Sequence, residues 1–425
     1  MTSTVPVGGD VRTVAPGEIV LGLQGTVDYE IEWDQSVVDA LVREYAIDSS
    51  EIDPLVPIRD ERSLLVALLG FLATGEGGER HARSSAIVER FAARFHREIT
   101  LGGTCVRAAL VLRRLGIPSL LHLVSTDENV RRLLPADCEA ITSATSDTLD
   151  PHLIIQFRPG DGARVGAAEF VVSEANRVIV ANDPPAENLV LSGDLGDRVA
   201  VSRVFLISGF NTISDTEVLR ARLDEIRDVA GRVPDGGVVV YEDAGFHDHA
   251  HQPTVSDAIG PVVDVFSLNE DELQARIGRR FDLLNAAEVV GAVRELRRQV
   301  PDPTLVVHTR YWTIVLTTPE NRAQLEAVVA AADAGNATAA GRYAFGDNVT
   351  ADDIARIAAG PRQAASAVCA RDVENLFGTL GRCVPGFHVD VPHPTTIGLG
   401  DTFIGGLIGA LAQGSAPPEQ PETGR

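Results

Sequence analysis

The sequence predicts an α/β fold in which helices cover both faces of a doubly wound, mostly parallel sheet, with a small α/β lid attached to it. Three observations predict this fold. Short apolar runs alternate with amphipathic helical segments from residue 203 to residue 309, as in sheets built by right-handed crossovers. Two more apolar runs lie within residues 151–185, where the short connection suits a hairpin. A glycine-punctuated loop at residues 393–400 opens a final apolar helix.

The N-terminal part predicts strands and helices separated by glycines. Residues 18–33 predict a strand, a glycine-bearing turn and a second strand. Residues 63–73 and 84–96 have the apolar spacing of helices, and the glycine cluster at residues 75–79 predicts a loop between them. That cluster follows no strand and has no basic partner, so it is not a dinucleotide-binding fingerprint.

Two units precede the regular alternation. Gly102 and Gly103 predict a turn, followed by a helix that ends at Gly116 and by an apolar strand, together one strand–helix–strand unit of a parallel sheet. Residues 152–157 and 176–183 predict the two strands of the hairpin. The strands of the regular region are then expected at residues 203–209, 237–243, 262–268 and 304–309. A further strand, two alanine-rich helices and the last apolar helix follow.

The chain of 425 residues, 44% of them hydrophobic, can bury a full core and fold as two domains. The large domain is expected to comprise residues 1–27, 101–150 and 186–412. The small lid is expected to comprise residues 28–100 and 151–185. Residues 413–425 are rich in proline and glutamate and are expected to be disordered.

Composition excludes several classes of chemistry. The chain has 60 Asp and Glu against 37 basic residues, all arginine, and a formal charge of -23. Without lysine it can form no Schiff base with pyridoxal phosphate, and it lacks the phosphate-binding lysine of P-loop and protein-kinase sites. The acidic excess argues against nucleic acids and anionic membranes as partners. Small molecules are the expected partners, and the sequence does not reveal the oligomeric state.

The expected location is the cytoplasm. The N-terminal residues lack the basic and apolar regions of a signal peptide, and no apolar run reaches transmembrane length. The four cysteines are scattered without a Cys-x-x-Cys pair, which favours reduced thiols over disulfides or a zinc site.

Polar residues follow four of the predicted strands. In a doubly wound sheet the ligand crevice lies at the carboxyl ends of the strands, so these positions are the candidates for a site. The four segments are residues 208–211, 242–248, 267–272 and 308–312.

The loop with Gly398 and Gly400 is the strongest chemical signal. Its glycines allow backbone N–H groups to converge at a helix N-terminus, where they can hold phosphoryl oxygens. Asp401 at the same place could accept the proton of an attacking hydroxyl. The structural alternative is that Asp401 only caps the helix.

Other polar residues also have two interpretations. Asn269 and Glu272 have the spacing of a capping box, while the acidic cluster around them could order Mg²⁺ and its waters. His247, His249 and His251 could form a metal site, but the rim of a cleft or a solvated loop is favoured.

Two further candidates precede or follow strands on the lid side. Asp28 could accept sugar hydroxyls or be an ordinary turn aspartate. Arg177 begins a strand of the hairpin, where an arginine is usually solvated.

Ten segments in order carry a family resemblance. They are residues 22–28, 74–79, 101–109, 152–157, 175–184, 206–211, 238–245, 267–272, 306–309 and 395–403. Together they resemble the ADP-dependent sugar kinases, the glucokinase and phosphofructokinase branch of the ribokinase-like superfamily. The Gly-x-Gly-Asp loop and the Asn-x-x-Glu pattern are the most diagnostic pair. The resemblance implies a ribokinase-like fold, ADP as phosphoryl donor and Mg²⁺ as cofactor.

The resemblance also implies roles for individual residues. Asp401 would be the catalytic base, and the amides of Gly398, Leu399 and Gly400 would form the anion hole. The metal would be organised by Glu242 and Glu272. The sugar would contact Asp28, Glu79, Gly102, Gly103, Gln156 and Arg177. The nucleotide would contact Asn269, His308, Thr309, Ile397 and Gly400.

Three positions depart from the family pattern. Val240 stands where a histidine precedes the metal-site glutamate, Gln156 replaces a glutamate, and Thr104 replaces an asparagine. The expected activity is phosphoryl transfer from ADP to glucose or fructose 6-phosphate. The alternatives are an ATP-dependent kinase for another sugar, a polyol or a nucleoside, and a catalytically silent sugar- or nucleotide-binding homologue.

Overall fold

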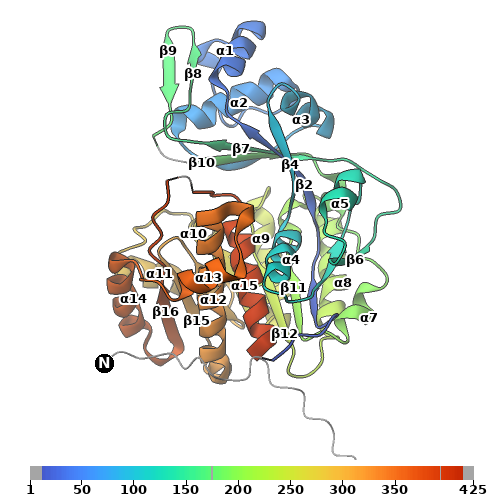
Figure 1. Cartoon of the computed structure of the whole chain (residues 1–425), viewed down its shortest axis with the longest axis vertical. Helices are drawn as coiled ribbons and strands as arrows, with labels where there is room; N and C mark the ends of the chain where they lie inside the picture. The colour runs from blue at the N-terminus through green and yellow to red at the C-terminus, as the bar shows by residue number, and fades with distance from the viewer. Residues whose placement is uncertain (1–11, 174–175, 393, 415–425) are drawn as a thin grey trace, which may run out of the picture.

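A computed structural model describes residues 12–173, 176–392 and 394–414 of the chain (Figure 1). Residues 413 and 414, expected to belong to a disordered tail, instead complete the last helix, and residues 415–425 lie outside the described residues. None of the described helices is long and apolar enough to span a membrane.

The large sheet contains nine strands among the described residues. In spatial order these are β16 (Gly381–Pro385), β15 (Trp312–Leu316), β14 (Thr304–His308), β13 (Val265–Asn269), β12 (Val238–Glu242), β11 (Val204–Ile207), β1 (Ile19–Leu21), β5 (Leu120–Leu123) and β6 (Glu139–Thr142). All neighbours pair in parallel except the antiparallel pairs that β15 makes with β14 and β16. The order reverses between β11 and β1, so a switch point lies there.

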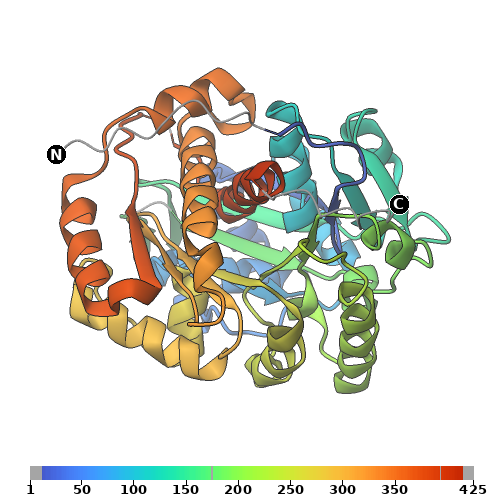
Figure 2. The same ribbon diagram turned by 90° about the horizontal axis from the view of Figure 1, so that it is seen from below.

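Helices cover both faces of this sheet, as Figure 2 shows from below. One face carries α4 (Thr104–Arg114), α12 (Leu325–Phe345) and α15 (Leu399–Gly414), which pack on one another. The other face carries α8 (Thr216–Ala230), α9 (Gln252–Ile259), α11 (Ala286–Gln299) and α14 (Ala364–Phe377). Because both faces are covered, strands such as β14 and β15 are buried along their whole length and are almost continuously apolar. The predicted α/β fold class is confirmed.

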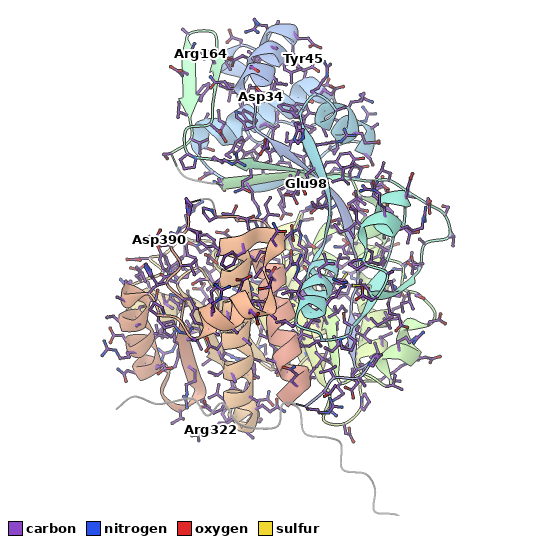
Figure 3. All side chains as sticks on the ribbon, in the orientation of Figure 1. Asp34, Tyr45, Glu98, Arg164, Arg322 and Asp390 are labelled. Carbon is purple, nitrogen blue, oxygen red and sulfur yellow. The ribbon has the colours of Figure 1, made fainter. Side chains whose placement is uncertain are left out.

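The small sheet has five strands among the described residues, in the order β3 (Gly78–His81), β10 (Asn176–Ala181), β7 (His152–Phe157), β2 (Thr26–Glu32) and β4 (Arg97–Gly102). The expected hairpin is present, since β7 and β10 pair antiparallel. Its outer side carries α1 (Gln35–Glu44), α2 (Glu61–Thr74), α3 (Ser85–Ala92) and the hairpin of β8 (Gly162–Val165) and β9 (Ala168–Val171). Figure 3 places Asp34 and Tyr45 at this outer end and Arg322 at the opposite end of the molecule.

Short elements connect these layers. They are α5 (Glu128–Leu133), α6 (Pro184–Asn188), α7 (Leu195–Val199), α10 (Glu270–Ile277) and α13 (Ala351–Ala358). The sequence predicted two helices between the further strand and the glycine loop, whereas the described residues there form three α-helices, α12, α13 and α14; it did not predict β16. β16 forms by pairing with β15, a contact between segments far apart along the chain.

Three predictions for the N-terminal part were wrong. The glycine cluster at residues 75–79 was predicted to be a loop, but its last two residues belong to β3, which forms by pairing with β10. The helix expected to reach residue 96 ends at Ala92, since residue 97 begins β4. The strand before α4 is not in the same sheet as the strand after it: β4 pairs antiparallel with β2, whereas β5 pairs with β1. Helix α4 therefore connects the two sheets.

Candidate active site

A cleft of about 880 Å³ lies between the two sheets. All four polar strand ends expected from the sequence contribute to it, together with residues after β1 at the switch point. The candidate residues that line it are Asp28, Glu79, Gly103, Arg177, Glu242, Asn269, Glu272, His308, Thr309, Ile397, Gly398, Leu399, Gly400 and Asp401. The sheet topology therefore brings together residues from both ends of the chain.

The glycine loop enters α15 directly. Gly398 has φ +65°, a conformation that favours glycine, and its carbonyl accepts hydrogen bonds from the N–H and the hydroxyl of Thr402. The helix begins at Leu399, two residues before Asp401, so Asp401 lies in the first turn and is not the N-cap. Its side chain is 26% exposed and faces the cleft. The carboxylate is thus available to a ligand at the positive end of a helix.

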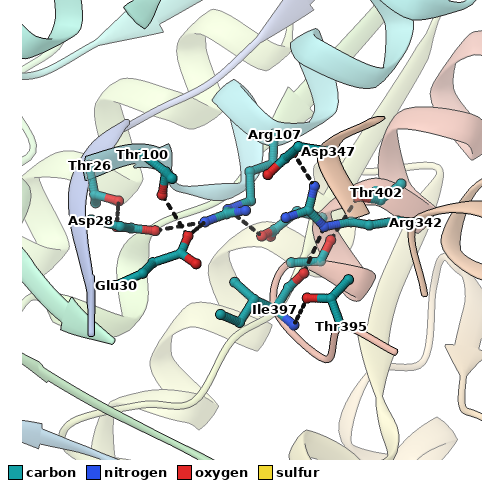
Figure 4. A network of polar contacts seen from close by, with 12 residues as sticks. Thr26, Asp28, Glu30, Thr100, Arg107, Arg342, Asp347, Thr395, Ile397 and Thr402 are labelled. Atoms are coloured by element: carbon teal, nitrogen blue, oxygen red, sulfur yellow. Dashed lines mark hydrogen bonds and ion pairs between the residues drawn. The ribbon is translucent and has the colours of Figure 1, made fainter. Parts of the chain in front are cut away.

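Arg107 of α4 connects this loop to the small sheet (Figure 4). Its Nη2 donates to Asp28 Oδ2 at 2.8 Å and to Glu30 Oε1 at 3.4 Å, and its Nε lies 3.9 Å from Asp401 Oδ2. Asp28 is only 4% exposed. Asp28 is therefore not an ordinary turn aspartate. It lies in the strand β2 and forms a buried ion pair with Arg107.

His308 and Arg342 also contact the glycine loop and the helix that follows it. The ring of His308 stacks on Phe403 with centroids 4.3 Å apart, and its Nε2 lies 3.1 Å from Glu242 Oε1. Arg342 donates from Nε to the carbonyl of Ile397 at 2.7 Å. These contacts fix the loop between α12 and the end of β14.

Glu242 is 5% exposed, and its Oε2 has no hydrogen-bond partner among the described residues. Burial raises the pKa of Glu242, although His308 beside it acts in the opposite direction. Burial and then the carboxylates of Glu242 and Asp243 raise the pKa of Glu272 well above its usual value. Glu242 Oε2, buried without a partner among the described residues, and the carboxylate of Glu272 are oxygen ligands that could hold a cation.

The capping box expected at Asn269 is present. Its side-chain oxygen accepts from the N–H of Glu272, and Glu272 Oε2 accepts from the Asn269 N–H at 2.8 Å. Thr309 also has a structural role, since its hydroxyl accepts from the N–H groups of Tyr311 and Trp312 in the β14–β15 turn. Both residues line the cleft as well, so capping and ligand binding are compatible.

The small-sheet wall presents Glu79 on β3 and Arg177 on β10, whose strands pair in parallel. Gln156 is the cross-strand partner of Arg177 but lies outside the cleft lining. Gly102 also lies outside it and leaves room for Asp28, because a Cβ at Gly102 would lie 2.1 Å from Asp28 Oδ2.

The three histidines after β12 are not grouped. His247 lines the cleft, His249 is exposed, and His251 is buried with its Nδ1 3.0 Å from the Ile213 carbonyl. No group of side chains in the described part of the chain has the arrangement of a metal centre. The position of His247 in the cleft lining fits the interpretation of this segment as a cleft rim.

Sequence reasoning missed Arg107 and Arg342. Both are arginines inside helices that looked purely structural, and each is 6% or less exposed. For Arg107 a signal did exist, since it follows the Gly102-Gly103 turn by one helical turn and lies between apolar residues. For Arg342 the contact with Ile397 joins distant segments and has no local signal.

Comparison with known proteins gives the family. A model described as "ADP-specific Phosphofructokinase/Glucokinase conserved region" matches residues 17–403. The chain belongs to this family. Members of the ADP-specific phosphofructokinase/glucokinase family are ADP-dependent sugar kinases, so the chain is a member of a phosphotransferase family, as predicted. No curated protein matches the chain.

Solved structures from the ADP-specific phosphofructokinase/glucokinase family share the fold at low identity. A phosphofructokinase from Pyrococcus horikoshii OT3 with AMP is 17% identical, with a TM-score of 0.72 over 94% of this chain and 99% of that one. An ADP-dependent kinase in complex with fructose-6-phosphate and ADPβS is 13% identical, with a TM-score of 0.73 over 94% of each chain. A structure described as the last common ancestor of ADP-dependent phosphofructokinases from Methanosarcinales is 14% identical, with a TM-score of 0.71 over 96% of this chain and 95% of that one.

Proposed function

We propose that the protein transfers the β-phosphoryl group of ADP to a hydroxyl of a hexose, with Asp401 as the general base. The observation that carries the proposal is the position of Asp401: it lies at the N-terminus of α15 beside two loop glycines, and it faces across the cleft to the small sheet. Membership of the ADP-specific phosphofructokinase/glucokinase family supports ADP as the donor.

In the proposed reaction the hydroxyl oxygen attacks the β-phosphorus of ADP. The bond between that phosphorus and the bridging oxygen breaks, AMP leaves with the electron pair, and the hydroxyl proton passes to the Asp401 carboxylate. The N–H groups of Gly398, Leu399 and Gly400 would hold the phosphoryl oxygens, because backbone amides at a helix N-terminus favour negative charge.

The residues present fit Mg²⁺. Glu242 Oε2 is buried without a partner among the described residues, and the Glu242 carboxylate raises the pKa of Glu272. Magnesium prefers carboxylates and retained waters, so we propose that these two glutamates hold its hydration shell. When bound, Mg²⁺ supplies neutralisation of the phosphate charge. Glu272 would hold water molecules of the Mg²⁺ hydration shell while its oxygens accept the hydrogen bonds of the capping box.

We further propose that the small sheet is part of a lid over the sugar, built from residues 28–100 and 151–185. Glu79, Arg177 and Asp28 all come from this sheet, whereas the phosphoryl loop belongs to the large domain. Closure of such a lid would exclude water and align the hydroxyl with the phosphoryl group.

The acceptor is proposed to be glucose or fructose 6-phosphate, which two residues of the small sheet should distinguish. Glu79→Gln is expected to lower kcat/KM for glucose by about tenfold or more, the scale of a lost hydrogen bond to a charged group. Arg177→Met is expected to lower kcat/KM for fructose 6-phosphate by a similar factor. Steady-state kinetics with both sugars checks this pair. If neither substitution changes either specificity, Glu79 and Arg177 do not contact the acceptor.

A donor-by-acceptor panel tests the proposed function. ADP, ATP and pyrophosphate are combined with glucose, fructose 6-phosphate, ribose and nucleosides in the presence of Mg²⁺. Turnover is expected with ADP and a hexose. Turnover with ATP alone would assign the protein to the ATP-dependent alternative. Nucleotide binding in a thermal-shift assay without turnover on any acceptor would favour the silent binding protein.

A further inference from the structure

Arg107 lies directly against the phosphoryl loop. It is in the first turn of α4, after Gly103, whose φ of +83° turns the chain from β4 into the helix. A Cβ placed on Gly398 would lie 2.7 Å from Arg107 Cδ and 3.0 Å from its Nη1. Arg107 is 6% exposed and lines the cleft. The Arg107 side chain therefore fills the space beside Gly398, in the loop expected to hold the phosphoryl oxygens.

One side of this guanidinium is fixed by two carboxylates. Nη2 donates to Asp28 and Glu30, and these are themselves held by the hydroxyls of Thr26, at 2.8 Å, and Thr100, at 2.6 Å. Figure 4 shows Asp28 and Glu30 of β2 meeting at this nitrogen, with Thr26 of β2 and Thr100 of β4 behind them. A guanidinium held in this way is already oriented before a ligand arrives, so little conformational freedom is lost on binding.

The Nη1 group of the Arg107 guanidinium is available for a ligand. Nη1 donates no hydrogen bond to any residue in the described part of the chain, although it lies next to Gly398. Nε lies 3.9 Å from Asp401 Oδ2, beyond hydrogen-bond distance. The N–H groups of Nη1 are therefore unused by the described residues, and they lie between the Gly398 loop and the Asp401 carboxylate.

Of the other arginines that line the cleft, Arg80 and Arg310 have contacts away from the glycine loop. Arg80 donates from Nη2 to the carbonyl of Val56 at 2.9 Å. Arg177 belongs to the small sheet, and Arg310 packs over the ring of Tyr311 at 4.7 Å. The chain has no lysine. Arg342 contacts the glycine loop through the carbonyl of Ile397 but does not line the cleft, whereas Arg107 lines the cleft and lies next to Gly398.

We propose that Arg107 is a further catalytic residue, which donates from Nη1 to the oxygens of the transferring phosphoryl group. This inference rests on the proposed function. Negative charge on those oxygens is spread and moved during transfer, and a preoriented donor beside them stabilises the transition state. Arg107 keeps its proton throughout. Asp28 then has a second role besides any contact with the sugar, because it orients the guanidinium.

Arg107→Lys separates this role from simple neutralisation of Asp28. Lysine retains the positive charge but has a single nitrogen, which cannot serve the carboxylates and the phosphoryl group together. Affinities for ADP and AMP are measured by calorimetry without acceptor, because AMP lacks the phosphoryl group to be transferred. The affinity of the variant for ADP is expected to fall by about tenfold or more, the scale of a lost charge-assisted hydrogen bond. Its affinity for AMP is expected to stay within about threefold of the wild type.

Arg113→Lys on the same helix is the matched control. Its side chain is 46% exposed and pairs with Asp137 at the surface, so both affinities should remain those of the wild type. If Arg107→Lys lowers the affinities for ADP and AMP equally, or lowers neither affinity, Arg107 has only a structural role. If that variant does not fold, the neutral pair Arg107→Gln with Asp28→Asn takes its place, with the same expected ratio and the same contrary result.

The inference and the proposed function fail in different ways. A wild-type protein that phosphorylates no hexose from ADP contradicts the proposed function. A wild-type protein that does so, together with an unchanged ratio of ADP to AMP affinity in Arg107→Lys, contradicts only the role of Arg107.

Discussion

Asp401→Asn is expected to lower kcat by about 100-fold or more, the scale of lost general-base catalysis. The amide is nearly the same size as the carboxylate, so the loop and the first turn of α15 should be unchanged, but it cannot accept the hydroxyl proton. Because Asp401 makes no hydrogen bond to the described residues, its loss should cost little stability. The measurement is steady-state kinetics with ADP and the preferred hexose, with thermal unfolding alongside.

Asp352→Asn provides the control for Asp401. Asp352 is also an aspartate in the first turn of a helix, but it is exposed on α13, away from the cleft. That variant should retain the kcat of the wild type. Turnover in Asp401→Asn within a few-fold of the wild type would remove the aspartate from its proposed role.

Arg276→Met is expected to lower the free energy of unfolding by about 3–5 kcal/mol, the range for breaking one partner of a buried ion pair. Arg276 Nε donates to Asp243 Oδ2 at 2.6 Å, and the two side chains are 1% and 0% exposed. Tyr241 donates its hydroxyl to the other oxygen of Asp243 at 3.0 Å. Removing the arginine leaves a buried carboxylate without its counter-charge, next to Glu242 at the edge of the cleft.

Denaturant unfolding of Arg276→Met measures this loss. Arg279→Met is the control, since Arg279 is 45% exposed and lies 3.6 Å from Glu295 at the surface; its substitution should cost about 1 kcal/mol or less. Adding Asp243→Asn to Arg276→Met should recover part of the stability, because it removes the unpaired charge. Equal losses in the arginine variant and its control would show that the ion pair is not a stabilising contact.

The sequence was sufficient for features with a local signal. The alternation of strands and helices predicted the parallel core, and the Gly398 loop was visible because glycines before an apolar helix form a local pattern. Where a residue follows its strand directly, as Glu242 and Asn269 do, the topology rule placed it in the cleft correctly.

Features made by distant pairing were not predictable from local patterns. β3 exists because it pairs with β10 about a hundred residues later, and its own sequence, Gly-Glu-Arg-His, has no apolar alternation. Arg107 looked like one charged residue on an amphipathic helix, since its partners Asp28 and Asp401 come from segments near the two ends of the chain. Such contacts need the tertiary fold.

The acidic chain without lysine can bind an anionic donor only through local positive features. In the described part of the chain, the amides at the N-terminus of α15 and the guanidinium of Arg107 lie together in the cleft, and a magnesium ion held by Glu242 and Glu272 would add positive charge there. The large negative charge of the whole molecule is therefore compatible with binding a nucleotide.

Product analysis tests the central proposal most directly. The protein is incubated with ADP, Mg²⁺ and either glucose or fructose 6-phosphate, and the phosphorus-containing products are resolved by ³¹P NMR. AMP and a newly phosphorylated hexose are expected in equal amounts. Release of AMP with inorganic phosphate in place of a hexose phosphate, or phosphorylation of the hexose from ATP but not from ADP, would contradict the proposal.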